Sequence, residues 1–205
     1  EEKVFYLTML EMHTRSTGLI EAMLRAQQAA RQDQPDALAG ALVDIIHTLR
    51  EMTFVSLMKI DPNPYSDTFT DPLIWAKTVA PFAAPTRPDE LGLSGGGAPV
   101  FHLLDAFFER GAFASQIGHE VMELTKWTPL YHRQFITHIA GHSMLKYLQQ
   151  RGLSELAGVY RSALDAYCGP RGWLGMHRLK VYGFMELGFK IGRTQTNGGF
   201  SGEAE

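Results

Sequence analysis

The sequence has little cysteine and little net charge. Its 205 residues include one cysteine, Cys168, which excludes an internal disulfide framework and is typical of a reducing cytoplasm. The formal net charge is −3, so there is no basic excess to bind phosphates, and nucleic acid is not expected as a partner. No run of about 18 apolar residues is present, which argues against a transmembrane helix. No signal-peptide pattern begins the chain. We therefore predict a cytoplasmic protein that does not cross a membrane.

An initiator methionine and a leading helix cap are also lacking. Apolar side chains recur at three- and four-residue steps from the start, as at Val4, Leu7 and Leu10, which predicts that the chain begins inside a helix. We therefore expect residues 1–205 to be a single helical domain that forms the C-terminal part of a longer protein. The preceding segment would then be one of its partners.

Helical spacing dominates the rest of the chain, and no β-hairpin pattern is found, so the predicted fold class is all-α. Further helices are expected at about 36–60, 73–81, 99–109, 113–125, 129–150 and 153–190. The last should break at "CGPRG", 168–172, and "DPNPYSDTFTDP", 61–72, should be an irregular connector. Two loops, 82–99 and 192–205, are rich in glycine, which permits close approach to a ligand.

The histidines offer one candidate metal pair. His138 and His142 are four residues apart, which places them on one face of a helix and suits two ligands of one ion. No third ligand lies beside them, so the pattern is weak. Nucleophilic catalysis has less support, because no G-x-S-x-G elbow occurs and Cys168 has no recognisable partner.

A different histidine stands on an apolar stripe. Trp173, His177, Val181 and Phe184 follow one another at steps of four, four and three residues. An apolar wall with one imidazole is what a haem iron requires. A core histidine that is hydrogen-bonded to a neighbour has the same spacing, so spacing alone leaves both interpretations open.

Four stretches in a fixed order carry a family resemblance. They are "SGGGAPVFHLLDAFF" (94–108), "TPLYHRQFITHI" (128–139), "LAGVYRSALDAYCGPRGWLGMHRLKVYGFM" (156–185) and "TQTNGGFSG" (194–202). With them the chain resembles, from about residue 5 to 202, the indoleamine 2,3-dioxygenase side of the haem-dependent tryptophan dioxygenase superfamily. The details are most similar to a bacterial secondary-metabolism branch. Its members include an enzyme that rearranges a chlorinated tryptophan in the pyrrolnitrin pathway and an oxygenase of 2-methylindole.

The resemblance implies a helical haem b domain with His177 as the proximal ligand of the iron. It also implies surroundings for the haem: Val100 and Phe101 on the proximal face, Asp105 near the proximal helix, Ser94, Gly95 and Gly96 at the haem edge, and Thr196, Gly198 and Gly199 in a lid over the substrate. Trp173 and Val181 share the stripe of His177 and would line the same wall. The implied reaction is addition of oxygen, with O2 as co-substrate, at the C2–C3 bond of an indole or tryptophan derivative. No catalytic acid or base is expected from the chain.

The chain departs from the family at two arginines. Leu174 stands where the dioxygenase has an arginine three residues before its proximal histidine, and Arg171 or Arg178 are the available replacements. The segment 62–82 lacks the family's distal arginine, which holds a substrate carboxylate, and offers Lys77 instead. A decarboxylated or alkylated indole is compatible with this, as is a carboxylate held by Lys77.

Two other function classes remain open at this point. One is a non-catalytic haem sensor or carrier, and the other is a helical interaction protein without a cofactor. A homo-oligomer is compatible with all three.

Overall fold

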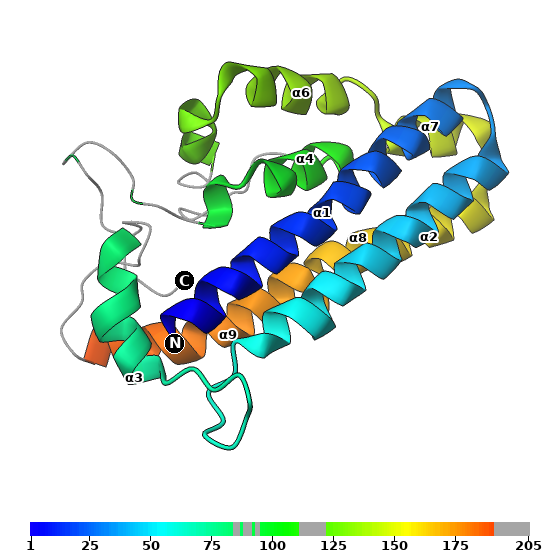
Figure 1. The fold of residues 1–205 in the computed structure, drawn as a ribbon. Coiled ribbons are helices and arrows are strands. Elements are labelled where there is room, and N and C mark those ends of the chain that lie inside the picture. The colour runs from blue at the N-terminus through cyan, green and yellow to red at the C-terminus, as the bar shows by residue number, and fades with distance from the viewer. Residues whose placement is uncertain (84–86, 88–91, 93–94, 111–121, 191–205) are drawn as a thin grey trace.

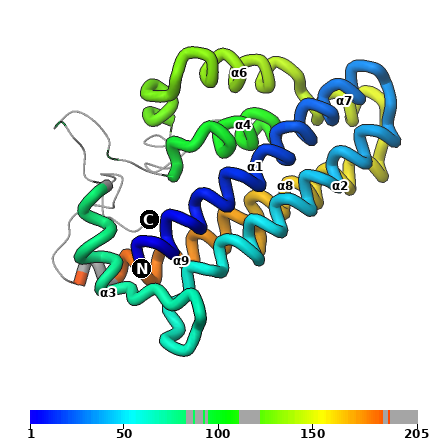
Figure 2. Tube along the Cα trace, in the orientation of Figure 1, coloured from blue at the N-terminus to red at the C-terminus, as the bar shows by residue number. Residues whose placement is uncertain are grey.

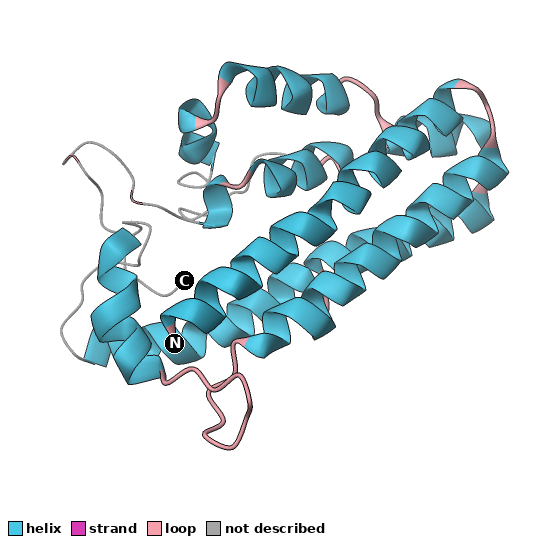
Figure 3. Cartoon of the chain, in the orientation of Figure 1, coloured by secondary structure: helices cyan, strands magenta, loops and turns pink. Residues whose placement is uncertain are grey.

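The fold is all-α, as predicted. The computed structural model describes residues 1–83, 87, 92, 95–110 and 122–190. Within these ranges every regular element is helical and no strand occurs (Figure 3). Asp61 and Phe69 form a single isolated bridge. Most of the predicted helix 113–125 lies outside the described ranges.

Two long helices form the framework of the molecule. α1 (Glu2–Arg31) and α2 (Pro35–Glu51) run antiparallel as a helical hairpin (Figure 1). α8 (Ser154–Cys168) and α9 (Trp173–Lys190) run along this hairpin. α2 contacts both α1 and α8. Its inward stripe explains this position, since apolar side chains three or four residues apart are fully buried: Leu38, Leu42, Ile45 and Leu49.

A second layer lies across α1. α4 (Pro99–Phe107) packs against α6 (Leu130–Ala140) and contacts α1 (Figure 2). α7 (Met144–Arg151) follows α6 and contacts α8. The prediction of one helix over 129–150 is therefore wrong. The helix ends at Ala140, and the Ser143 side chain accepts a hydrogen bond from the Lys146 backbone N–H, which starts a new helix.

Irregular helical turns extend the regular helices. After α2 come a π-helical turn, η1 (Met52–Ser56), and a 3-10 turn, η2 (Leu57–Lys59), so the predicted helix 36–60 is confirmed with altered geometry. The predicted helix 73–81 is likewise a succession of short turns. These are α3 (Pro72–Ile74), η3 (Trp75–Val79) and η4 (Ala80–Ala83). Two further 3-10 turns are η5 (Gly95–Gly97) and η6 (Thr125–Trp127).

The predicted connector 61–72 is irregular, as expected, and its aspartates act as turn residues. Asp61 Oδ1 accepts a hydrogen bond from the Asn63 backbone N–H. Asp71 caps α3 by accepting from the backbone N–H groups of Leu73 and Ile74. The connector therefore ends where the next helical turns begin.

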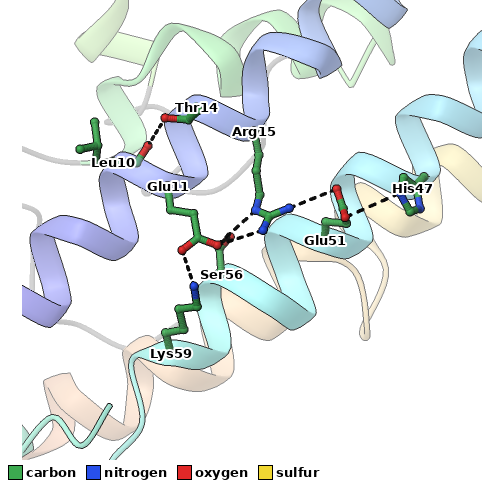
Figure 4. A network of polar contacts seen from close by, with 8 residues as sticks. All are labelled: Leu10, Glu11, Thr14, Arg15, His47, Glu51, Ser56 and Lys59. Carbon is green, nitrogen blue, oxygen red and sulfur yellow. Dashed lines mark hydrogen bonds and ion pairs between the residues drawn. The ribbon is translucent and has the colours of Figure 1, made fainter. Parts of the chain in front are cut away.

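A polar network ties α1 to the end of α2 (Figure 4). The Glu11 carboxylate accepts hydrogen bonds from Arg15, Ser56 and Lys59. The Lys59 ammonium is the largest cause of a lowered pKa for Glu11. Arg15 also pairs with Glu51 at 3.2 Å. The network thus fixes the π-helical turn against the first helix.

The break between α8 and α9 is confirmed, and it is unusually tight. α8 ends at Cys168 and α9 begins at Trp173. A Cβ atom on Gly172 would overlap the Asp165 carbonyl oxygen, and one on Gly175 would overlap the Pro170 carbonyl oxygen. Only glycine lets the first turn of α9 approach the preceding backbone so closely.

We expect Gly175→Ala to lower the free energy of unfolding by about 1–3 kcal/mol, because the added methyl group has to displace backbone. The matched control is Gly158→Ala in α8, where a Cβ would meet nothing within 4 Å. There the same change should stabilise the helix by about 0.5–1 kcal/mol. Urea unfolding followed by circular dichroism measures both, and equal effects would contradict this account of the turn.

Candidate functional site

His177 lies in α9, one turn after the tight turn that starts the helix. Its imidazole stacks on the Trp173 indole, with ring centroids 4.9 Å apart and planes at 10°. The indole in turn stacks on the Phe101 ring of α4, with centroids 4.2 Å apart and planes at 28°. The three rings therefore link α4 to α9 at the place where the sequence predicted a haem ligand.

The same stretch of α9 lies between two apolar clusters. Trp173 belongs to the main core, and Phe184 belongs to a smaller cluster. The smaller cluster consists of Ile60, Trp75, Ala76, Val79, Ala80 and Phe184, with Phe5 against it. His177 and Val181 lie between Trp173 and Phe184 along α9, and both are partly buried. Val181 belongs to neither cluster. This stretch of α9 is thus a junction between two apolar clusters, and it carries the imidazole.

The surroundings of His177 keep its imidazole neutral. Desolvation by burial lowers its pKa from the ordinary 6.5 to about 4. No hydrogen bond joins its ring nitrogens to another described residue. Trp173 Nε1 beside it is buried and also has no partner in the described part of the chain. Within the described residues, two neighbouring polar side chains thus form no hydrogen bond, and a neutral imidazole is the form that binds a metal.

A partly buried charged cluster lies one turn further along α4, on the same face as Phe101. Asp105 pairs with Arg110 at 2.7 Å and accepts a hydrogen bond of 3.0 Å from the Tyr167 hydroxyl of α8. The Arg110 guanidinium also lies over the Tyr167 ring, 5.3 Å from its centroid. Burial raises the pKa of Asp105, and Arg110 and Tyr167 oppose that rise. The carboxylate is thus satisfied within the cluster.

Two neighbours of Asp105 are also shifted by burial. Burial raises the pKa of Tyr167, so its hydroxyl stays a donor. Burial lowers the pKa of His102, although the charge of Asp105 opposes this. The His102 Nε2 atom is buried with no hydrogen-bond partner in the described residues.

The predicted haem-contacting residues of α4 have defined places in the fold. Val100 lies in the main core and is 4% exposed, while Phe101 is partly buried with its ring on Trp173. Asp105 contacts Arg110 and Tyr167, and no hydrogen bond joins it to His177. Among the described residues the structure therefore joins Phe101, Trp173 and His177 directly, and it places Asp105 in the separate charged cluster.

The predicted loop residues are only partly described. Gly95 and Gly96 form part of η5, and a Cβ on Gly95 would lie 3.6 Å from Met9 Cε of α1. Ser94 and the predicted lid residues Thr196, Gly198 and Gly199 lie outside the described residues, with the rest of 192–205 and much of 82–99. Their roles stay predictions.

The arginine beside Asp105 was missed by the sequence reasoning. Arg171 is exposed, and the exposed Arg178 lies 5.2 Å from the Tyr182 ring centroid. Arg110 is the arginine that reaches Asp105. Its signal was the five-residue spacing across the end of α4. Tyr167 had no signal beyond the apolar stripe of α8.

The segment 62–82, in which Lys77 could hold a substrate carboxylate, has side chains on both an exposed and a buried face. Lys77 of η3 is exposed, whereas Trp75 of the same turn is buried against Phe5 and Phe184, with ring centroids 5.6 Å and 5.5 Å away. The lysine side chain is therefore on the outer face of η3, away from the aromatic cluster.

His138 and His142 lie close together, with His138 exposed and His142 partly buried. The rings of His138 and His142 are 5.2 Å apart, and an Arg31 guanidinium nitrogen lies 3.4 Å from His138 Nε2. Within the described ranges, no group of three or more histidine, cysteine, aspartate or glutamate side chains could hold a metal ion.

Comparison with protein-family models and with curated proteins gives no match for this chain. In the part that the structure describes, no helix has both the length and the apolar character needed to cross a membrane.

Replacing Tyr167 by Phe should lower the free energy of unfolding by about 1–3 kcal/mol, since the partly buried Asp105 carboxylate loses a donor. Tyr65→Phe is the control, because Tyr65 is 94% exposed and its change should stay within about 0.5 kcal/mol. Chemical denaturation at neutral pH compares the two. A harmless Tyr167→Phe would mean that the hydroxyl is not needed to satisfy Asp105.

The lowered pKa of His177 predicts a pH dependence of stability. The unfolded chain takes up a proton near pH 6.5 and the folded chain only near pH 4, so the free energy of unfolding should fall as the pH drops through this window. His177→Phe should reduce that fall, whereas the exposed His132→Phe should keep it. Urea titrations at pH 7, 6, 5 and 4.5 measure the slopes, and identical slopes for all three proteins would refute the assignment.

Proposed function

We propose that this protein is a haem-dependent oxygenase of an indole-type substrate, with His177 as the iron ligand. The observation that supports the proposal is the neutral imidazole of His177, without a hydrogen-bond partner among the described residues, at the junction of two apolar clusters. The resemblance to the indoleamine 2,3-dioxygenase side of the superfamily supplies the reaction class.

The residues at the junction fit a haem. The donor set is one neutral imidazole, which suits an axial ligand of haem iron. Beside it lie the stacked rings of Phe101 and Trp173 and the aliphatic side chain of Val181, an apolar setting that suits a haem. Trp173 Nε1, which has no partner among the described residues, would find an acceptor in a bound polar group.

When bound, the haem would activate O2 for attack on the C2–C3 bond of the indole. The chain would bind, orient and exclude water. His177 would hold the iron, and Phe101 and Trp173 would cover the protein side of the site. The loop containing Thr196, Gly198 and Gly199 would close over the substrate.

The substrate we propose is an indole without a carboxylate. The segment 62–82 contains no arginine, and the side chain of Lys77 is exposed. A free amino acid would leave its carboxylate without a buried cationic partner from this segment, which is costly in an apolar site. We therefore expect methylindoles to be better substrates than tryptophan.

We expect the protein supplied with haem to show a sharp Soret band that shifts when CO is added after reduction. His177→Ala should broaden or abolish this band because the axial ligand is lost. His132→Ala, at an exposed position, should leave it unchanged. Absorption spectra of the three proteins measure this, and a band that survives His177→Ala would exclude His177 as the ligand.

Oxygen consumption then separates an oxygenase from a haem sensor or carrier. The haem-loaded protein is reduced and mixed with indole, 2-methylindole, 3-methylindole or tryptophan. Turnover with a methylindole supports the proposal. A normal Soret band with no consumption for any of them favours the sensor or carrier, and a protein that takes up no haem favours a helical interaction protein.

A further inference from the structure

We propose that Trp173 is a positioning residue that fixes the plane of the His177 imidazole. The importance of this role for iron ligation rests on the proposed function, whereas the role itself concerns only the two rings. In most metal sites the second ring nitrogen of a ligating histidine donates a hydrogen bond, which fixes the orientation of the ring. His177 has no such partner among the described residues, and an aromatic face takes its place.

The stacking geometry restrains the imidazole directly. The two planes lie at 10° with centroids 4.9 Å apart, so the indole lies over part of one face of the imidazole in an offset stack. Rotation about the Cβ–Cγ bond of His177 would drive a ring edge into the indole. The lone pair of a ring nitrogen lies in the ring plane, so a fixed plane also fixes the directions from which a metal can be bound.

The indole is itself held in place. Trp173 is 5% exposed and is stacked on Phe101, with the ring centroids 4.2 Å apart. The carbonyl oxygen of Phe101 accepts a hydrogen bond of 3.4 Å from the Tyr167 hydroxyl. The turn before Trp173 is too tight to admit a side chain at Gly172. A rigid support of this kind is what positions a ligand side chain accurately.

The magnitude of the effect follows from the stacking contact. Aromatic pairs of this type contribute enough for a change of roughly threefold to tenfold in an equilibrium constant. Loss of the indole should therefore weaken haem binding by that factor without abolishing it. Loss of His177 itself should have a much larger effect.

Proton NMR of the haem-free protein tests the positioning role. In the wild type the His177 ring protons should be shifted upfield by the indole ring current and should show nuclear Overhauser contacts to Trp173. Trp173→Leu should remove the shift, and Trp173→Phe should retain most of it because a flat face remains. Trp127→Leu is the matched control, since Trp127 is 59% exposed.

The wild-type Overhauser contacts keep the test decisive if Trp173→Leu does not fold. Their absence, or ring-proton shifts that are the same in Trp173→Leu and the wild type, would overturn the proposal.

Resonance Raman spectra of the haem-loaded proteins test what the orientation does. The iron–histidine stretching band should shift or broaden in Trp173→Leu, with haem release about threefold to tenfold faster, and should stay near the wild-type position in Trp173→Phe and Trp127→Leu. An unchanged band in Trp173→Leu would show that the stack does not set the ligand bond. A wild type without a Soret band would overturn the proposed function, while the NMR result would still decide the positioning role.

Discussion

The close contact between the end of α8 and the start of α9 is the constraint on which the candidate site depends. Gly172 and Gly175 let α9 begin directly against the carbonyl groups of Asp165 and Pro170. Trp173 follows at once, so its indole is carried to Phe101 of α4. His177 lies one turn further along α9, so its position depends on where this helix begins. A looser turn would move both rings together.

α4 contacts aromatic rings through one residue and a charged cluster through another. Through Phe101 it contacts the rings of α9, and through Asp105, one turn later, it contacts Tyr167 of α8. The charge of Asp105 is met by Arg110 and Tyr167, so this carboxylate has partners of its own. The His177 imidazole therefore remains neutral in an apolar setting. A neutral imidazole in an apolar setting is what the proposed haem ligation requires.

Local patterns predicted most helices, because helical spacing and turn residues act over a few positions. The break at 168–172 was visible as Gly-Pro-Arg-Gly, and the Trp173–His177 pairing as a four-residue step. The interruption after Ala140 was missed because apolar spacing outweighed the cap at Ser143. Tyr167 was missed because its partner is 62 residues away, and no local pattern encodes such a contact. The haem and the indole still rest on resemblance and chemistry.

The small aromatic cluster of Trp75, Phe184 and Phe5 has a consequence for dynamics. It is built from few side chains and is separate from the main core. Local opening costs a free energy that scales with the apolar contacts broken, so the turns from 60 to 83 can detach from α9 while the long helices remain paired. The smaller cluster is therefore expected to lose amide-exchange protection before the main core does.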